Sequence, residues 1–191
     1  MGMKRIICML LACVLCVSAL GGCQGGKEPL ADDDFEYYDE NGQMQEFDEE
    51  EHVTTMSRGE EIAGKTLQTK RGVKIGDPIS VIAEKYDVSV ARAVYYYEGG
   101  EAGELREFTE KYPTGEDAFN HLDEIKDKFD LEEDYTAEED YIFIDFCVLD
   151  NGEYIASRDA GDRPASSLAF KIFLVDGEYV IHEICIYRVN K

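Results

Sequence analysis

Histidine and basic side chains are scarce in this sequence, and their scarcity argues against several classes of protein. The 191 residues hold 3 histidines and 19 lysines and arginines against 42 acidic residues, a formal net charge of −23. A surface this acidic repels nucleic acid and anionic lipid headgroups, so we expect neither to be a ligand. A cationic partner stays open, although acidity is also a common means of solubility.

The sequence also lacks the motifs of common catalytic and metal-binding sites. His52, His121 and His182 are far apart and none belongs to an H-E-x-x-H motif, so we expect no zinc site. No G-x-S-x-G, P-loop or G-x-G-x-x-G motif follows residue 22. Asp145 is the one acid inside an apolar run, and we expect it to point outward from a half-exposed strand. The expectation is a protein without enzyme activity, metal or cofactor.

The first 22 residues have the order of a secretory signal peptide. Lys4 and Arg5 precede an apolar stretch too short to cross a bilayer, which takes about 20 residues. The segment Leu20-Gly21-Gly22-Cys23 at its end resembles the lipobox of bacterial lipoproteins. That resemblance implies cleavage between Gly22 and Cys23, a diacylglyceryl thioether on Cys23, and lipid anchoring at the extracytoplasmic face of the cell membrane.

Removal of residues 1–22 would leave 42 acidic and 17 basic residues, a net charge of −25, and three cysteines. Cys147 and Cys185 fall in predicted strands of one sheet. A disulfide between them is compatible with an extracytoplasmic location, and so are two free thiols; both alternatives stay open.

Residues 23–66 read as an acidic tether that follows the lipidated cysteine. Runs such as Asp32-Asp33-Asp34 and Asp48-Glu49-Glu50-Glu51 leave few aliphatic residues to bury, which predicts disorder. A flexible chain of about 40 residues has a root-mean-square length of about 35 Å. The acids are interrupted by Phe35, Tyr37, Tyr38, Met44 and Phe47. We interpret these as residues scattered in a linker, and a short partner-binding motif is the alternative.

Residues 67–191 carry the patterns of a single α+β domain. Asp77 and Pro78 predict the start of a helix over 78–87, and Thr114 with Asp117 predicts a capping box for a helix over 115–129. Strands are predicted at 93–97, 141–149, 154–157, 167–175 and 178–189, with 104–111 as an ambiguous strand and 131–140 as a loop. The fold class is α+β, with two helices packed on a four- to five-stranded antiparallel meander.

The last hairpin has a two-residue turn at Asp176-Gly177, which sets the faces of its strands. The predicted core face holds Leu168, Phe170, Ile172, Leu174, Tyr179, Ile181, Cys185 and Tyr187. The opposite, mixed face holds Lys171, Phe173, Val180, His182 and Ile184. A half-apolar face of this kind is compatible with solvent exposure and with a bound partner, and both alternatives stay open.

The stretch from Val73 to Tyr86, with Ile75-Gly76-Asp77-Pro78 and Val81, resembles the helix entry of the SmpA/OmlA (BamE) lipoproteins and of β-lactamase inhibitor protein. The resemblance implies a helical pair followed by a small antiparallel meander. We expect a membrane-anchored, non-catalytic binding or assembly module of the cell envelope. The alternatives are an envelope-polymer hydrolase and a signalling or inhibitory lipoprotein that binds a protein partner.

Overall fold

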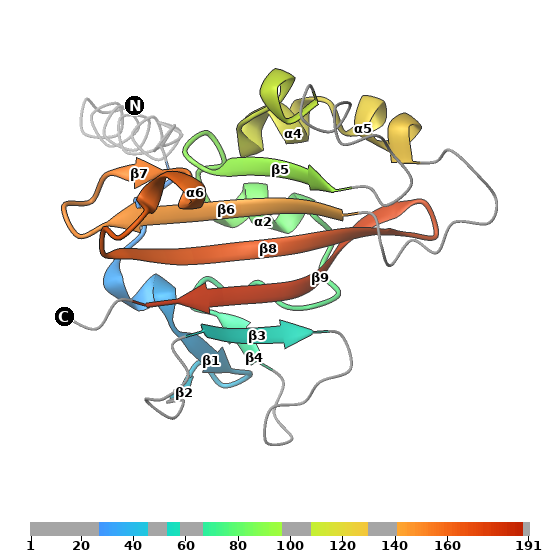
Figure 1. The fold of residues 1–191 in the computed structure, drawn as a ribbon. Coiled ribbons are helices and arrows are strands. Elements are labelled where there is room, and N and C mark those ends of the chain that lie inside the picture. Colours follow the sequence, from blue (N-terminus) through green and yellow to red (C-terminus); the bar gives the residue numbers. More distant parts are fainter. Residues whose placement is uncertain (1–26, 46–52, 58–66, 97–107, 130–140, 189–191) are drawn as a thin grey trace, which may run out of the picture.

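The centre of the computed structural model is an antiparallel sheet in the strand order β3-β9-β8-β6-β5 (Figure 1). The structure describes residues 27–45, 53–57, 67–96, 108–129 and 141–188. A short strand, β7, pairs with the end of β6 that β5 leaves free. The strands of this main sheet are β3 (Val53–Ser57), β5 (Arg92–Tyr96), β6 (Tyr141–Leu149), β7 (Tyr154–Ile155), β8 (Ala165–Val175) and β9 (Glu178–Tyr187).

Short helices and a second, three-stranded antiparallel sheet accompany the main sheet in the described residues. The small sheet has the order β2-β1-β4. The predicted α+β class with antiparallel pairing is therefore confirmed. These elements are η1 (Asp32–Phe35), β1 (Tyr37–Asp39), β2 (Met44–Gln45), β4 (Leu67–Thr69), α2 (Ser80–Lys85), α4 (Gly115–Asn120), α5 (Leu122–Phe129) and α6 (Ser157–Ala160).

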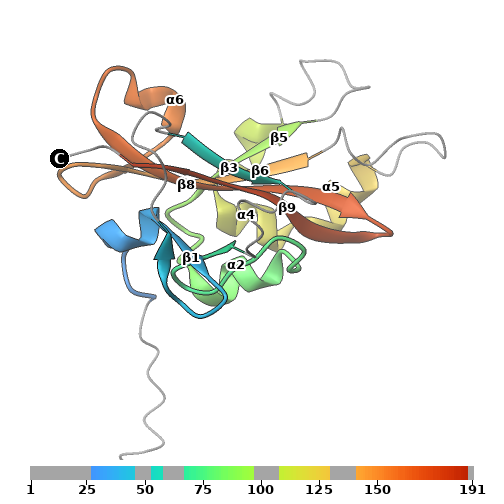
Figure 2. The same cartoon turned by 90° about the horizontal axis from the view of Figure 1, so that it is seen from below.

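The core lies on one side of the main sheet, between the sheet and α2, α4, α5 and β1. Figure 2 shows α2, α4 and β1 on this side and α6 on the other. Ile82 of α2 and Ile125 of α5 are fully buried, as are the sheet residues Ile144, Phe170 and Ile181. We call this side of the sheet the core face and the opposite side the outer face.

The helix predicted over 78–87 begins later, at Ser80, because the backbone before it pairs with β9. The amide of Ile79 donates to the carbonyl of Tyr179 at 3.0 Å, and the amide of Ile181 donates to the carbonyl of Asp77 at 2.9 Å. The Asp77 carboxylate accepts from the Lys74 amide at 2.8 Å, so its predicted role as helix cap is wrong.

The predicted capping box at Thr114 is confirmed. The amide of Asp117 donates to Thr114 Oγ1 at 3.1 Å, and the Asp117 carboxylate accepts from the Thr114 amide at 3.1 Å. The helix predicted over 115–129 is interrupted at His121, whose φ of −127° and ψ of 25° are not helical, and becomes α4 and α5. Residues 108–111 are helical instead of extended, and the predicted loop at 131–140 lies outside the described residues.

The prediction of a disordered segment is wrong for residues 27–45. Phe35 and Tyr37 are buried in the core, and β1 pairs with β4. The Tyr37 hydroxyl donates to the carbonyl of Ile184 in β9 at 2.9 Å. The aromatic residues among the acids thus bury enough apolar surface to order this segment, although its acidic composition predicted disorder. The rest of the predicted tether, apart from the backbone of β3, lies outside the described residues.

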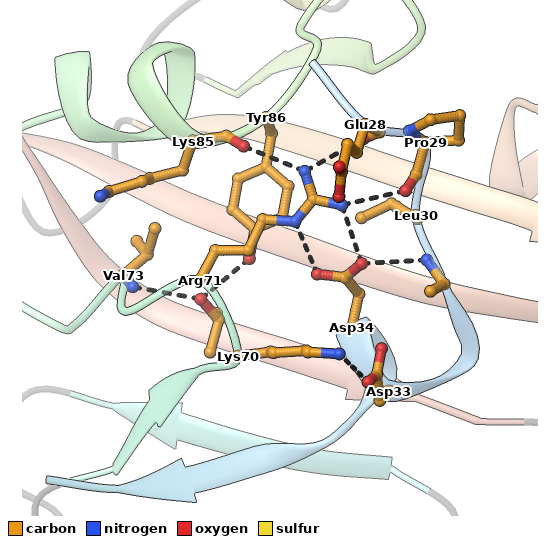
Figure 3. A network of polar contacts seen from close by, with 12 residues as sticks. Glu28, Pro29, Leu30, Asp33, Asp34, Lys70, Arg71, Val73, Lys85 and Tyr86 are labelled. Atoms are coloured by element: carbon orange, nitrogen blue, oxygen red, sulfur yellow. Dashed lines mark hydrogen bonds and ion pairs between the residues drawn. The ribbon is translucent and has the colours of Figure 1, made fainter. Parts of the chain in front are cut away.

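A network around Arg71 joins this N-terminal segment to the domain (Figure 3). Arg71 Nε and Nη2 donate to the two carboxylate oxygens of Asp34 at 2.7 and 2.8 Å. Its remaining N–H groups donate to the backbone carbonyls of Glu28, Pro29 and Lys85, each at 3.1 Å. The guanidinium also lies 4.8 Å from the centre of the Tyr86 ring. All five N–H donors of Arg71 are therefore used. We call this set of contacts the Arg71 cluster.

Candidate functional site

A β-bulge at His182 decides which side chains of β9 reach the outer face. Ile172 pairs with Ile181 while Lys171 pairs with Glu183, so His182 is an extra residue in β9. Beyond the bulge the alternation reverses. Ile184 is fully buried on the core face, so its predicted place on the outer face is wrong. Cys185 and Tyr187, predicted for the core, lie on the outer face.

The outer face carries a row of four rings, one from each of four neighbouring strands. Tyr96 of β5 and Tyr141 of β6 stack with their ring centres 4.4 Å apart. Tyr141 meets Phe173 of β8 edge to face at 5.8 Å, and Phe173 lies 4.3 Å from the His182 ring. We call Tyr96, Tyr141, Phe173 and His182 the aromatic row.

Strand pairing explains why these rings meet. Tyr96 pairs directly with Tyr141, and Tyr141 pairs directly with Phe173. Directly opposed side chains on one face of an antiparallel sheet lie about 5 Å apart, which suits ring contacts. Phe173 is buried, whereas the Tyr96 side of the row is open to solvent, with 42% of Tyr96 exposed.

Lys171 adds a positive charge to the aromatic row. Its Nζ lies 4.4 Å from the Tyr141 ring centre and 5.1 Å from that of Phe173. The same ammonium bonds Glu183 Oε1 at 3.3 Å, and that oxygen lies 3.9 Å from His182 Nδ1. Desolvation and the nearby Glu183 charge both raise the pKa of Tyr141, so its phenol remains a neutral hydrogen-bonding group. The site thus combines aromatic surface with a cation and a carboxylate.

Asp145 lies on the same face but is buried, with 2% of its surface exposed. Its Oδ1 accepts from Ser167 Oγ at 2.7 Å. Burial raises the pKa of Asp145, and hydrogen bonds from Ser157 and Ser167 offset part of that rise. The sequence-based expectation of an outward, half-exposed acid is therefore only half right, because α6 contacts this end of the face.

Cys147 and Cys185 lie on the outer face, and neither is part of a disulfide. They flank β8, opposite Ser167 and Ala169 respectively. Two strand spacings of about 4.8 Å, together with the two-residue offset along β8, put their Cα atoms more than about 10 Å apart, beyond the 7 Å or so that a disulfide can bridge. Burial, with the negative charge of Asp145, raises the pKa of Cys147 to about 11, which makes it a poor nucleophile.

The arrangement does not favour a hydrolase. Asp145 lines up with Ala169 and Cys185, whereas His182 lies two strands away and beyond Lys171. This register separates the Cα atoms of Asp145 and His182 by more than about 10 Å, too far for an acid to orient an imidazole. In the described ranges, no group of three His, Cys, Asp or Glu side chains is placed to hold a metal ion.

Of the predicted contact residues, Lys171, Phe173 and His182 are brought together in or beside the aromatic row. Val180 lies on the same face opposite Phe173. Sequence reasoning did not assign Tyr141 or Glu183 to this face, and for the run Tyr95-Tyr96-Tyr97 it favoured a split between core and surface over a stacking site. The pairing of 92–96 with 141–145 would have revealed the two tyrosines, but it joins strands 45 or more residues apart. Gly22 and Cys23 lie outside the described residues, so the lipobox stays a prediction.

The chain matches no protein-family model, no curated protein and no solved structure. The resemblance of residues 73–86 to the SmpA/OmlA lipoproteins and β-lactamase inhibitor protein consequently stays a prediction. Among the described residues, no helix combines the length and hydrophobicity that crossing a bilayer requires.

Proposed function

We propose that this protein is a lipid-anchored, extracytoplasmic and non-catalytic module of the cell envelope that binds a protein partner through the outer face. The segment Leu20–Cys23 supports the anchor and its location. The aromatic row beside Lys171 and Glu183 is the observation that carries the binding role. Tyrosine and phenylalanine are enriched at protein interfaces because a ring supplies large contact area at low entropic cost.

The anchor is tested by expressing the full chain in bacteria with and without globomycin, an inhibitor of lipoprotein signal cleavage. We expect a mature N-terminus at Cys23 whose mass includes a diacylglyceryl group, and accumulation of the precursor with the inhibitor. Replacing Cys23 by Ser should prevent lipid attachment and the cleavage that depends on it, so the precursor should accumulate without the inhibitor. A freely soluble mature chain with an unmodified thiol would refute the anchor.

The binding role is tested with a photo-crosslinking residue at position 96. We expect one crosslinked product in intact envelopes, and its loss when Lys171→Glu is added. Met44 is a matched control, because it is 45% exposed and lies on the small sheet. A crosslinker at position 44 should not give that product. A specific interface on the outer face would be refuted if positions 96 and 44 gave the same amount of product, or if Lys171→Glu left the product from position 96 unchanged.

A further inference from the structure

We propose that the Arg71 cluster holds the domain close to the membrane, with its core-face side toward the bilayer and its outer face directed away. This inference rests on the proposed lipid at Cys23, and it specifies how the outer face is oriented relative to the membrane. The inference is based on residues 28–37 of the N-terminal segment and on the bonds that they make to the rest of the domain.

Chain length limits how far the domain can stand from the lipid. Glu28 is bonded to Arg71 through its carbonyl and is only five residues after Cys23. An extended chain covers at most about 3.5 Å per residue, so Glu28 lies within about 18 Å of the lipidated cysteine. A free segment over 24–65 would instead allow a root-mean-square distance of about 35 Å.

The contacts of residues 28–37 place the attachment point on the core-face side. Phe35 and Tyr37 are part of the core, and the Leu30 amide donates to the Tyr154 hydroxyl at 2.9 Å. Figure 2 shows η1 and β1 on the same side of the main sheet as α2. The aromatic row is on the other side, with the sheet between. A short link from the core-face side therefore leaves the aromatic row turned toward the aqueous compartment.

The attachment is strong enough to persist without a partner. The Asp34 side chain is 3% exposed and that of Arg71 is 18% exposed. Release of residues 28–34 would break two charged hydrogen bonds and three further ones from a single guanidinium. Charge-assisted, bidentate pairs are among the strongest hydrogen bonds in proteins. The state in which residues 28–34 are bonded to Arg71 therefore dominates over the state in which they are released.

The test measures energy transfer from a donor on the lipidated, full mature protein to acceptor lipids in liposomes. One donor is placed at Glu84, exposed on α2, and another at Arg92, exposed on the outer face. We expect stronger transfer from position 84 than from position 92. An insertion of 20 Gly and Ser residues between Gly26 and Lys27 precedes Glu28, which is bonded to Arg71, so we expect the fold to be kept. It adds about 25 Å of reach and should weaken transfer from both positions.

A double variant, Arg71→Leu with Asp34→Leu, tests the cluster itself without leaving a buried charge unpaired. It removes the bonds that Arg71 makes to Glu28, Pro29 and Asp34 and leaves the Leu30–Tyr154 and Asp33–Lys70 contacts. Transfer from position 84 should therefore fall to between the native and insertion values. Arg158→Leu with Asp159→Leu is the matched control, because that pair is exposed, and it should change nothing.

Two results would overturn the inference: equal or stronger transfer from position 92, or an insertion that moves neither label. The mass of the N-terminal peptide is read on the same sample. If it lacks the lipid, the proposed anchor fails and this inference with it. If the lipid is present and the distances disagree, only the orientation fails.

Discussion

Asp34 and Arg71 are 37 positions apart in the chain and face each other through two parallel hydrogen bonds, 2.7 and 2.8 Å long. The pair connects a segment rich in acids to the turn that follows β4. Asp34 is buried and Arg71 is partly exposed, so removing Asp34 leaves the Arg71 charge without its partner.

We therefore expect Asp34→Ala to lower the free energy of unfolding by about 3 kcal/mol, the lower end of the range for breaking a buried pair, because Arg71 is partly exposed. Urea denaturation measures it. Asp33→Ala is the control. Asp33 pairs with Lys70, and both side chains are 40% or more exposed, so its loss should not exceed about 1 kcal/mol. Equal losses would contradict a structural role for the Arg71 cluster.

The bulge in β9 predicts that deleting His182 is tolerated. Without it, Ile181 and Glu183 become neighbours while Ile172 and Lys171 remain opposite them, so Ile184 and Ile186 keep their places in the core. Deleting Cys185 instead must turn at least one buried isoleucine outward.

We expect the Cys185 deletion to cost about 1.5–3 kcal/mol more than the His182 deletion, which is what burial of one isoleucine is worth. Thermal and urea unfolding of both deletions provide the comparison. If the two were equally destabilised, the inserted residue would not be His182.

Asp145 predicts a particular pH dependence. Its pKa in the folded protein is raised above the ordinary value of 3.8, chiefly by burial. The folded state therefore holds this proton more tightly than the unfolded chain, and the stability it contributes is present below pH 3.8 and lost as pH rises through the raised pKa.

Relative to the native protein, Asp145→Asn should become progressively more stable as pH increases from 3.8, until the folded-state pKa is passed. Denaturation midpoints over a pH series test this difference. Ser167→Ala should enlarge the pH effect of Asp145, because it removes a hydrogen bond that favours the ionised form. A difference independent of pH would contradict the buried position.

The two thiols are expected to stay unlinked. In the chain from residue 24 onward, alkylation in denaturant without reductant should add two groups. Under native conditions Cys185 should react before Cys147, which is buried and has a pKa of about 11. Mass spectrometry of the peptides measures both. Absence of labelling before reduction would show a disulfide and a different pairing of β8.

Much of the local structure can be predicted from the sequence because it depends on residues only a few positions apart. The capping box joins Thr114 to Asp117, and Asp176-Gly177 forms the predicted two-residue turn with both φ values positive, 51° and 80°. The strands around these signals follow from their apolar runs. Lys171, Phe173 and His182 could be assigned to one face without knowing the other strands.

The sequence by itself thus determined the α+β class, the hairpins and part of the outer face, since neighbouring residues supply their hydrogen bonds and periodicity. Only the tertiary structure decided that residues 27–45 pack on the domain, because Asp34 and Tyr37 find their partners at Arg71 and Ile184. It also decided the bulge at His182, which reassigns Ile184 to the core. A one-residue insertion reverses every later side chain, and its placement depends on how the whole sheet buries its isoleucines.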